Sequence, residues 1–140
     1  MKMRSHCPIN YALEHFGDKW SLLIIRDLMF KEKRHYNEFF ESDERVSTSV
    51  LGDRLKQLIE AGIICKGEDL VKKSRIKYSL TKKGIAMLPI MVDMIVWSGT
   101  FDDQTEAGED FLTQAGKNRD HLLSSLKVKL EKEHLIKPNE

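Results

Sequence analysis

Residues 46–66 read VSTSVLGDRLKQLIEAGIICK, and this stretch decides the fold. Its apolar side chains recur every three or four residues, which is the period of an amphipathic helix with one buried face. Ser47 stands where a hydroxyl caps the first turn, and Gly62 stands where a left-handed residue closes the last turn. The run Ile63-Ile64-Cys65 then predicts a short buried strand. The apolar stripe consists of Leu51, Leu55, Leu58 and Ile59.

The opposite face of this helix begins with small or short polar side chains. Small hydroxyls at the start of a helix allow a close approach to DNA phosphates or base edges. The alternative is an ordinary surface helix. Such a helix, however, usually carries long Glu and Lys side chains at these positions. Ser47 is mostly a cap, so the candidate DNA contacts on this face are Thr48, Ser49, Asp53 and Lys56.

Arg54 lies on the flank of the same helix and has two interpretations. Its guanidinium can pair with a DNA phosphate, which makes it a candidate DNA-binding residue. It can equally pair with an acidic neighbour in the chain, such as Glu38.

A β-hairpin with an exposed arm is predicted after the helix. The strand-like runs 63–65 and 77–80 have a period of two, and a polar segment separates them. Between Lys66 and Lys83 there are seven basic residues against two acidic ones. A basic hairpin directly after a small-residue helix is typical of nucleic-acid binding. The expected phosphate contacts on the arm are Lys72, Lys73 and Arg75.

Helices are predicted on both sides of this helix and hairpin. The expected helices are 8–16, 19–30, 36–40, a long one from Thr81 to Phe101 with a kink at Pro89, and a last one over 109–135. Together they predict a mainly α fold with a small β-hairpin, a winged helix-turn-helix with N- and C-terminal dimerisation helices. Residues 1–101 would form the DNA-binding domain with its dimerisation helix, and 102–140 a helical extension.

The composition indicates an intracellular protein, and the uneven charge along the chain indicates that one side of it meets a polyanion. The 140 residues are 41% apolar, show no signal-peptide pattern and contain no apolar run of membrane-spanning length. Two distant cysteines make no disulfide framework, which favours the cytoplasm. Residues 1–85 hold 17 basic against 12 acidic side chains, whereas residues 86–140 hold 6 against 10. The basic front is the side expected to meet nucleic acid.

The motifs of enzymes and metal sites are missing from the sequence. There is no glycine-rich phosphate loop, no H-E-x-x-H, no C-x-x-C and no nucleophile elbow. The histidines are scattered and do not have ligand spacing. We therefore expect no catalytic activity, no metal and no cofactor.

Cys7 is the candidate for switch chemistry. A thiol at a helix N-terminus feels the positive end of the helix dipole, and His6, Lys2 and Arg4 lie nearby in the sequence. Both effects lower the pKa of a thiol and favour the reactive thiolate. The alternative is an inert cysteine that only packs. Cys65, in the predicted strand, is expected to be structural.

Several short motifs along residues 7–99 resemble those of the HxlR-type winged helix-turn-helix transcriptional regulators, relatives of the MarR type. The motifs are Cys7-Pro8-Ile9, Asp18-Lys19-Trp20-Ser21, His35-Tyr36-Asn37-Glu38-Phe39, Gly62-Ile63-Ile64 and Tyr78-Ser79-Leu80-Thr81. The resemblance implies a cytoplasmic homodimer that binds double-stranded DNA with two recognition helices and two wings. It also implies that a small-molecule or oxidant effector can act, since several members sense electrophiles through the cysteine at the position of Cys7.

A homodimer is also favoured by apolar side chains near the chain ends. Apolar surface left open to water costs about 25 cal/mol per Å², and pairing across a two-fold axis buries it on both subunits at once. The alternative is that the last helix completes a monomeric core. The rival function is a winged-helix protein-interaction module without DNA binding. The expected seam consists of Ile9, Tyr11, Leu13, Ile95, Trp97, Phe101, Leu122, Leu123, Leu126 and Leu130.

Overall fold

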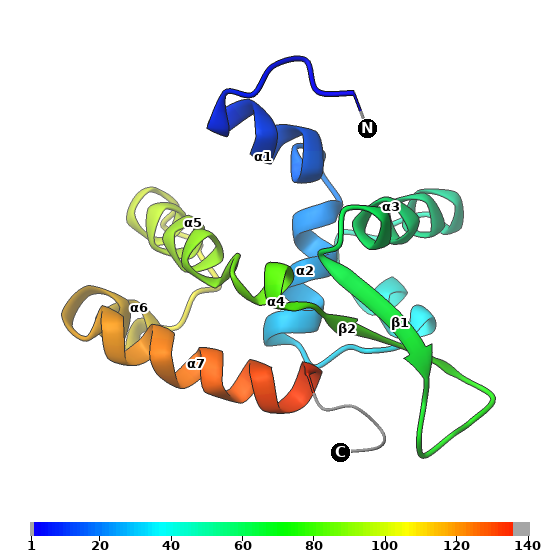
Figure 1. The fold of residues 1–140 in the computed structure, drawn as a ribbon. Coiled ribbons are helices and arrows are strands. Elements are labelled where there is room, and N and C mark those ends of the chain that lie inside the picture. Colours follow the sequence, from blue (N-terminus) through cyan, green and yellow to red (C-terminus); the bar gives the residue numbers. More distant parts are fainter. Residues whose placement is uncertain (1, 136–140) are drawn as a thin grey trace. The chain divides into compact units, whose positions relative to one another are not determined.

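The computed structural model describes residues 2–135. Contacts group the chain into two compact units, Met1–Thr81 and Lys82–Glu140, whose elements are shown in Figure 1. The sequence predicts a division after Phe101, whereas the compact units divide before the long apolar helix. The reason is that this helix packs against the helices that follow it.

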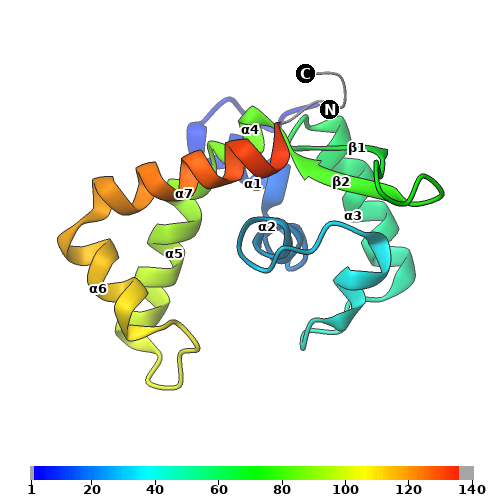
Figure 2. The ribbon, with the colours of Figure 1, turned by 90° about the horizontal axis from the view of Figure 1, so that it is seen from below.

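Four helical segments and a hairpin make up the first unit, in the predicted order. The helical segments are α1 (Pro8–Phe16), α2 (Ser21–Phe30), the 3-10 helix η1 (Tyr36–Glu41) and α3 (Thr48–Glu60). Helix α2 is central, with Ile25 and Leu28 fully enclosed. It packs against α3, and Figure 2 looks along α2 with α3 beside it. The α3 stripe of Leu51, Leu55 and Leu58 is buried as predicted, which explains why this segment is helical.

The predicted hairpin is present. Strands β1 (Ile64–Glu68) and β2 (Ile76–Leu80) are antiparallel, with Ile64 opposite Leu80 and Glu68 opposite Ile76. The expectation that Cys65 is buried is wrong. Side chains alternate between the two faces of a strand, so a buried Ile64 leaves Cys65 exposed opposite Ser79.

Both ends of α3 are closed as the sequence predicts. The Ser47 hydroxyl accepts a hydrogen bond from the backbone N–H of Val50 at 3.3 Å. Gly62 has φ of 75°, a left-handed conformation that is easiest for glycine. The order helix, helix, short helix, helix, strand, strand is that of a winged helix-turn-helix, so this part of the predicted fold class is confirmed. The dimerisation role of the N- and C-terminal helices stays a prediction.

The second unit contains more breaks than the sequence predicts. Its helices are α4 (Lys82–Ile85), α5 (Leu88–Phe101), α6 (Glu109–Lys117) and α7 (Arg119–His134). The single helix expected over 81–101 is interrupted after Ile85, because Pro89 lacks an N–H and its ring clashes with the carbonyl four residues back. The single helix expected over 109–135 is interrupted at Asn118, whose φ of −133° and ψ of 45° are not helical. Asparagine favours such positions because its side chain competes with the backbone for hydrogen bonds.

Helices α6 and α7 pack onto α4 and α5 to close this unit. A Cβ on Gly99 of α5 would lie 3.0 Å from the side chain of Leu112 of α6, so the glycine allows the close approach. The Arg119 guanidinium, at the start of α7, forms an ion pair with Asp93 of α5. Leu130 is only 1% exposed, so its expected place in an intersubunit seam is wrong. Its side chain belongs to the core of its own chain.

Candidate nucleic-acid interface

The outward face of α3 is open along its first two turns. The predicted residues Thr48, Ser49, Asp53 and Lys56 are all exposed and lie on this face. The phenolic hydroxyl of Tyr36 donates to the Thr48 carbonyl at 3.3 Å, which fixes the entrance of the helix to η1. The face is therefore both positioned by its own unit and accessible.

Gly52 occupies the middle of this face, and no contact among residues 2–135 requires a glycine there. A Cβ placed on it would have no atom within 4 Å, so neither packing nor an unusual φ requires glycine there. Glycine in a helix interior costs about 1 kcal/mol relative to alanine. Contacts among residues 2–135 therefore do not explain the glycine at this position.

Arg54 is already engaged by carboxylates within the chain. Its Nη1 donates to Asp53 Oδ2 at 2.7 Å, and its Nε lies 3.1 Å from Asp18 Oδ1. The predicted partner Glu38 is wrong, since Glu38 instead accepts from the loop before η1. Two carboxylates near one guanidinium mean that Arg54 reaches a phosphate only by exchanging a partner.

Asp18 links this arginine to the start of α2. The Asp18 carboxylate accepts from the backbone N–H groups of Trp20 at 2.7 Å and Ser21 at 2.9 Å. Burial acts to raise the pKa of Asp18, but the hydrogen bonds from Ser21 and Trp20 and the charge of Arg54 outweigh it and lower the pKa. The carboxylate is thus ionised and holds α3 against the beginning of α2.

The wing tip, defined here as residues 69–75, is folded around the Asp69 carboxylate. Asp69 Oδ1 accepts from the backbone N–H of Val71 at 2.9 Å and of Lys72 at 3.3 Å. The backbone closes the same turn, since Asp69 N–H donates to the Arg75 carbonyl and Arg75 N–H to the Lys72 carbonyl. An aspartate that accepts from the following N–H groups stabilises a turn in this way.

The other oxygen of Asp69 is held by His35, from the loop before η1. His35 Nε2 lies 2.7 Å from Asp69 Oδ2, and His35 Nδ1 lies 2.6 Å from Glu38 Oε1. Both ring nitrogens of His35 therefore lie within hydrogen-bond distance of a carboxylate oxygen. We call this arrangement of His35, Glu38 and Asp69 the wing clamp.

Both carboxylates of the wing clamp have lowered pKa values. The hydrogen bond from His35, followed by those from the N–H groups of Val71 and Lys72, holds the pKa of Asp69 well below its usual range. Burial acts to raise the pKa of Glu38, but the hydrogen bonds from His35 and the Arg34 N–H outweigh it and lower the pKa. Both carboxylates of the clamp are therefore ionised near neutral pH.

Arg34 joins strand β2, which forms the base of the wing, to the same loop before η1. Its Nε donates to the Tyr78 carbonyl at 2.7 Å and its Nη2 to the Ser79 hydroxyl. In return the Tyr78 N–H donates to the Arg34 carbonyl at 2.7 Å. Strand β2 thus has fixed contacts at its base through Arg34, while the clamp fixes the tip.

The surface of the wing tip is basic and apolar at once. Lys72 and Lys73 are exposed, whereas Arg75 is half-buried, so the two lysines are better placed for phosphates than the arginine. Leu70 is 60% exposed and Val71 89% exposed. Apolar side chains next to lysines suit a contact in which the apolar groups enter a DNA groove and the lysines reach the phosphates that flank it.

Cys7 lies at the N-cap of α1 and is exposed, as a reactive thiol requires. Hydrogen bonding from the backbone N–H groups of Asn10 and Ile9 lowers the pKa of the thiol. Arg4 is not the cause, because its guanidinium pairs with Glu14 and Asn10. The exposed Cys65 is a second accessible thiol of the same unit.

All predicted DNA-binding residues lie in the first unit, on α3 or the wing tip. The sequence prediction missed His35 and Asp69 as the residues that hold the wing. A His-x-x-Glu spacing at the start of η1 was a usable signal for a capping box. An aspartate before a turn, as at Asp69, was a second usable signal. No sequence pattern, however, predicts a contact between two residues that lie 34 positions apart. Within residues 2–135 no three His, Cys, Asp or Glu side chains are grouped to hold a metal ion.

Comparison of sequences finds the same type of protein repeatedly. The profile of the HxlR-like helix-turn-helix family matches residues 15–106. The HTH-type transcriptional regulator sll1512 of Synechocystis sp. is 31% identical over 112 residues, which are 80% of this chain and 82% of that protein. The HTH-type transcriptional regulator YodB of Bacillus subtilis is 31% identical over 96 residues, 68% of this chain and 85% of that protein.

Solved structures of similar fold are also regulators. The redox regulator HypR in its oxidised form has a TM-score of 0.61 and 26% identity, covering 69% of this chain and 99% of that chain. The reduced form of YodB from Bacillus subtilis has a TM-score of 0.58 and 25% identity, covering 73% of this chain and 99% of that chain. Nearly the whole of each of these proteins therefore has a counterpart in this chain.

Proposed function

Because this chain belongs to the HxlR-like helix-turn-helix family of DNA-binding transcriptional regulators, we propose that α3 and the wing tip form its contact with operator DNA. The observation that carries this proposal is the open face of α3 around Gly52, where no contact among the described residues requires a glycine. Helix α3 would enter the major groove with its N-terminal residues against base edges, as recognition helices of this type do.

The two parts of the surface would have different tasks. Thr48, Ser49 and Lys56 on α3 are short or flexible side chains that can reach base edges and choose the sequence. Lys72 and Lys73 on the wing tip would neutralise phosphates and bind all sequences alike. Asp53 and Arg54 pair with each other, so Arg54 would reach a phosphate only by exchanging a carboxylate partner.

A homodimer is the form that we propose for DNA binding. On α1 the expected residues Ile9, Tyr11 and Leu13 are 70%, 43% and 51% exposed. On α5 the exposed side chains recur at intervals of three and four, which places them on one face of the helix. They are Ile90, Met94, Trp97 and Phe101.

This exposed stripe on α5 also explains an unusual property of the second unit. By length and composition alone, Lys82–Phe101 would be long and apolar enough to cross a membrane, and only a third of it is buried inside the chain. A helix that pairs with a second copy needs the same excess of apolar side chains. We propose that pairing between subunits, in the cytoplasm, covers it.

Cys7 is proposed as a redox- or electrophile-responsive residue. The support is its exposure, the lowered pKa of its thiol and the similarity to HypR, which is a redox regulator. A thiolate reacts with oxidants where a thiol does not. Modification at the N-cap of α1 would disturb the helix that carries Ile9 and Tyr11, and so the proposed dimer. No catalytic activity is proposed.

Selection of bound duplexes from a random pool tests the function. Two recognition helices would recover a motif with two half-sites spaced by about one DNA turn, roughly 10 bp. Recovery of no motif, together with no duplex binding at low salt, would favour the protein-interaction module instead.

A further inference from the structure

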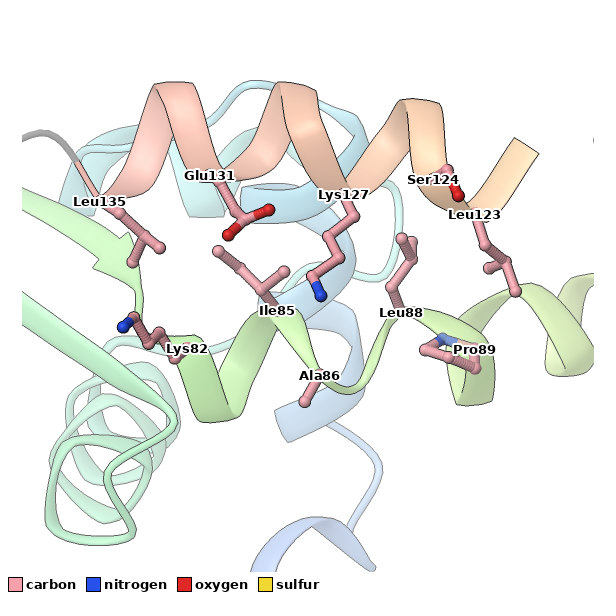
Figure 3. Close-up of a pocket in the computed structure, with 10 residues that line it drawn as sticks. All are labelled: Lys82, Ile85, Ala86, Leu88, Pro89, Leu123, Ser124, Lys127, Glu131 and Leu135. Atoms are coloured by element: carbon pink, nitrogen blue, oxygen red, sulfur yellow. The ribbon is translucent and has the colours of Figure 1, made fainter. Parts of the chain in front are cut away.

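The last helix, α7, forms one side of a pocket in the second unit. Both α6 and α7 lie beyond residue 106, where the family match ends. The pocket has a volume of about 500 Å³, and its walls are α4 and the start of α5 on one side and α7 on the other (Figure 3). Pockets of about 300–1,000 Å³ are the usual size for small organic ligands. Without α7 this space would be open surface.

The floor and ends of the pocket are apolar. Ile85 and Leu88 point up from α4 and the start of α5 toward α7 in Figure 3, and Leu123 points down from α7 toward Pro89. Leu135 closes the opposite end. The break after Ile85 that Pro89 imposes turns the chain here and shapes the floor. A ligand must therefore have an apolar body.

The polar groups of the pocket are two lysines and one glutamate. Lys127 extends from α7 to a position between Ile85 and Leu88 (Figure 3). Lys82 and Glu131 are the other charged residues of the lining. Among residues 2–135 none of these three side chains has an ion-pair partner, whereas Lys129 of the same helix pairs with Glu133 at 3.9 Å. Two cations against one anion leave a single positive charge, the complement of a monoanion.

We propose that this pocket binds a small organic acid, with an aliphatic or aromatic body on the apolar floor and its carboxylate paired with Lys127. Glu131 selects against a second negative charge on the ligand, because like charges repel. The proposal concerns only the second unit and does not rest on the proposed DNA binding.

Octanoate, 1-octanol and octylammonium are suitable probes, because they share one apolar chain and differ in charge. Isothermal titration calorimetry of the full chain should detect octanoate at low-millimolar concentration or below, the range of weak small-ligand affinities. Octylammonium should bind at least about tenfold more weakly, since it loses the charge-assisted hydrogen bond. Equal affinity for the three probes, or no heat with octanoate, would overturn the proposal.

Paired variants locate the site. Ser124 lines the pocket and is exposed, so Ser124→Phe should fill it and abolish octanoate binding. Its neighbour Ser125 is exposed but does not line the pocket, so Ser125→Phe should bind as the wild type does. Lys127→Gln should remove the preference for octanoate over 1-octanol, and Lys132→Gln should retain it. Equal behaviour within either pair would overturn the assignment, and thermal melts of all four variants verify folding.

Discussion

His35 Nε2 lies 2.7 Å from Asp69 Oδ2, so the loop before η1 holds the tip of the wing. The contact joins residues that are distant in sequence, and it fixes the segment that carries Lys72 and Lys73. The position of these two lysines therefore depends on a histidine from a distant segment of the chain.

We expect Asp69→Ala to release the wing tip while leaving the core intact. The amides of Val71 and Lys72 lose their acceptor, so hydrogen exchange at both should accelerate. Duplex affinity should fall by about tenfold, because two phosphate contacts are misplaced. Asp43→Ala, at an exposed position outside the clamp, is the control. Unchanged exchange and unchanged affinity would show that the clamp does not position the wing.

The pH dependence of the wing follows from its carboxylates. The pKa values of Asp69 and Glu38 are lowered in the folded chain. Their contribution to stability is therefore present above the ordinary carboxyl pKa of about 4 and is lost as the pH falls through the lowered values. Protection of the Val71 amide should persist at about pH 5 and fade only well below about pH 4. Loss of protection between about pH 5 and pH 7 would show that the ionised carboxylates do not hold the clamp together.

Gly52→Ala should raise the stability of the protein and lower its affinity for operator DNA. Alanine removes a helix-interior glycine, so the free energy of unfolding should rise by up to about 1 kcal/mol. The added methyl group projects from the outward face of α3, so operator affinity should fall. Gly116→Ala in α6 is a matched control, since its Cβ would also meet no atom within 4 Å. Gly116→Ala should stabilise the protein without changing its affinity for DNA. Normal operator binding by the Gly52→Ala protein would exclude the outward face of α3 from the DNA interface.

The two exposed thiols can be compared directly. Cys7→Ser should preserve operator binding and abolish its release by diamide, since the lowered pKa of the Cys7 thiol makes it the reactive one. Cys65→Ser should still respond. A wild-type protein that ignores diamide, or a response that follows Cys65, would exclude Cys7 as the sensor. Gel-shift titration with and without diamide measures both.

The dimer should depend on the exposed stripe of α5. Trp97→Glu places a charge at a side chain that is 68% exposed in the single chain, so it should yield a monomer without unfolding it. Val128→Glu, at a 53% exposed apolar residue of α7, is the matched control and should remain dimeric. Sedimentation velocity distinguishes these states; a dimeric Trp97→Glu protein, or a monomeric wild type at micromolar concentration, would exclude the stripe as the interface.

Local patterns were sufficient to predict the first unit. The apolar period of α3, the Ser47 cap and the left-handed Gly62 are properties of short segments, and each is present in the structure. The hairpin followed from a change of period in the same way. Breaks in the second unit were harder, because a kink and a full interruption differ only in how Pro89 is accommodated.

Contacts between distant segments set the limit of the prediction for the site. The sequence places Arg54 on the correct flank of α3, but its partner Asp18 becomes visible only when α2 and α3 pack. The same holds for His35 and Asp69. Leu130 has the same spacing as its neighbours on α7, and periodicity cannot distinguish burial in the chain's own core from burial in an interface.

The salt dependence of binding to a selected duplex tests the central claim most directly. If α3 and the wing contact DNA, log K should fall steeply and linearly with log salt concentration, and Lys72→Ala with Lys73→Ala should reduce the slope by about two units. The selected duplex should be preferred over a random one by about a thousandfold or more. Binding that is independent of salt, or equal for both duplexes, would contradict sequence-specific recognition by this surface.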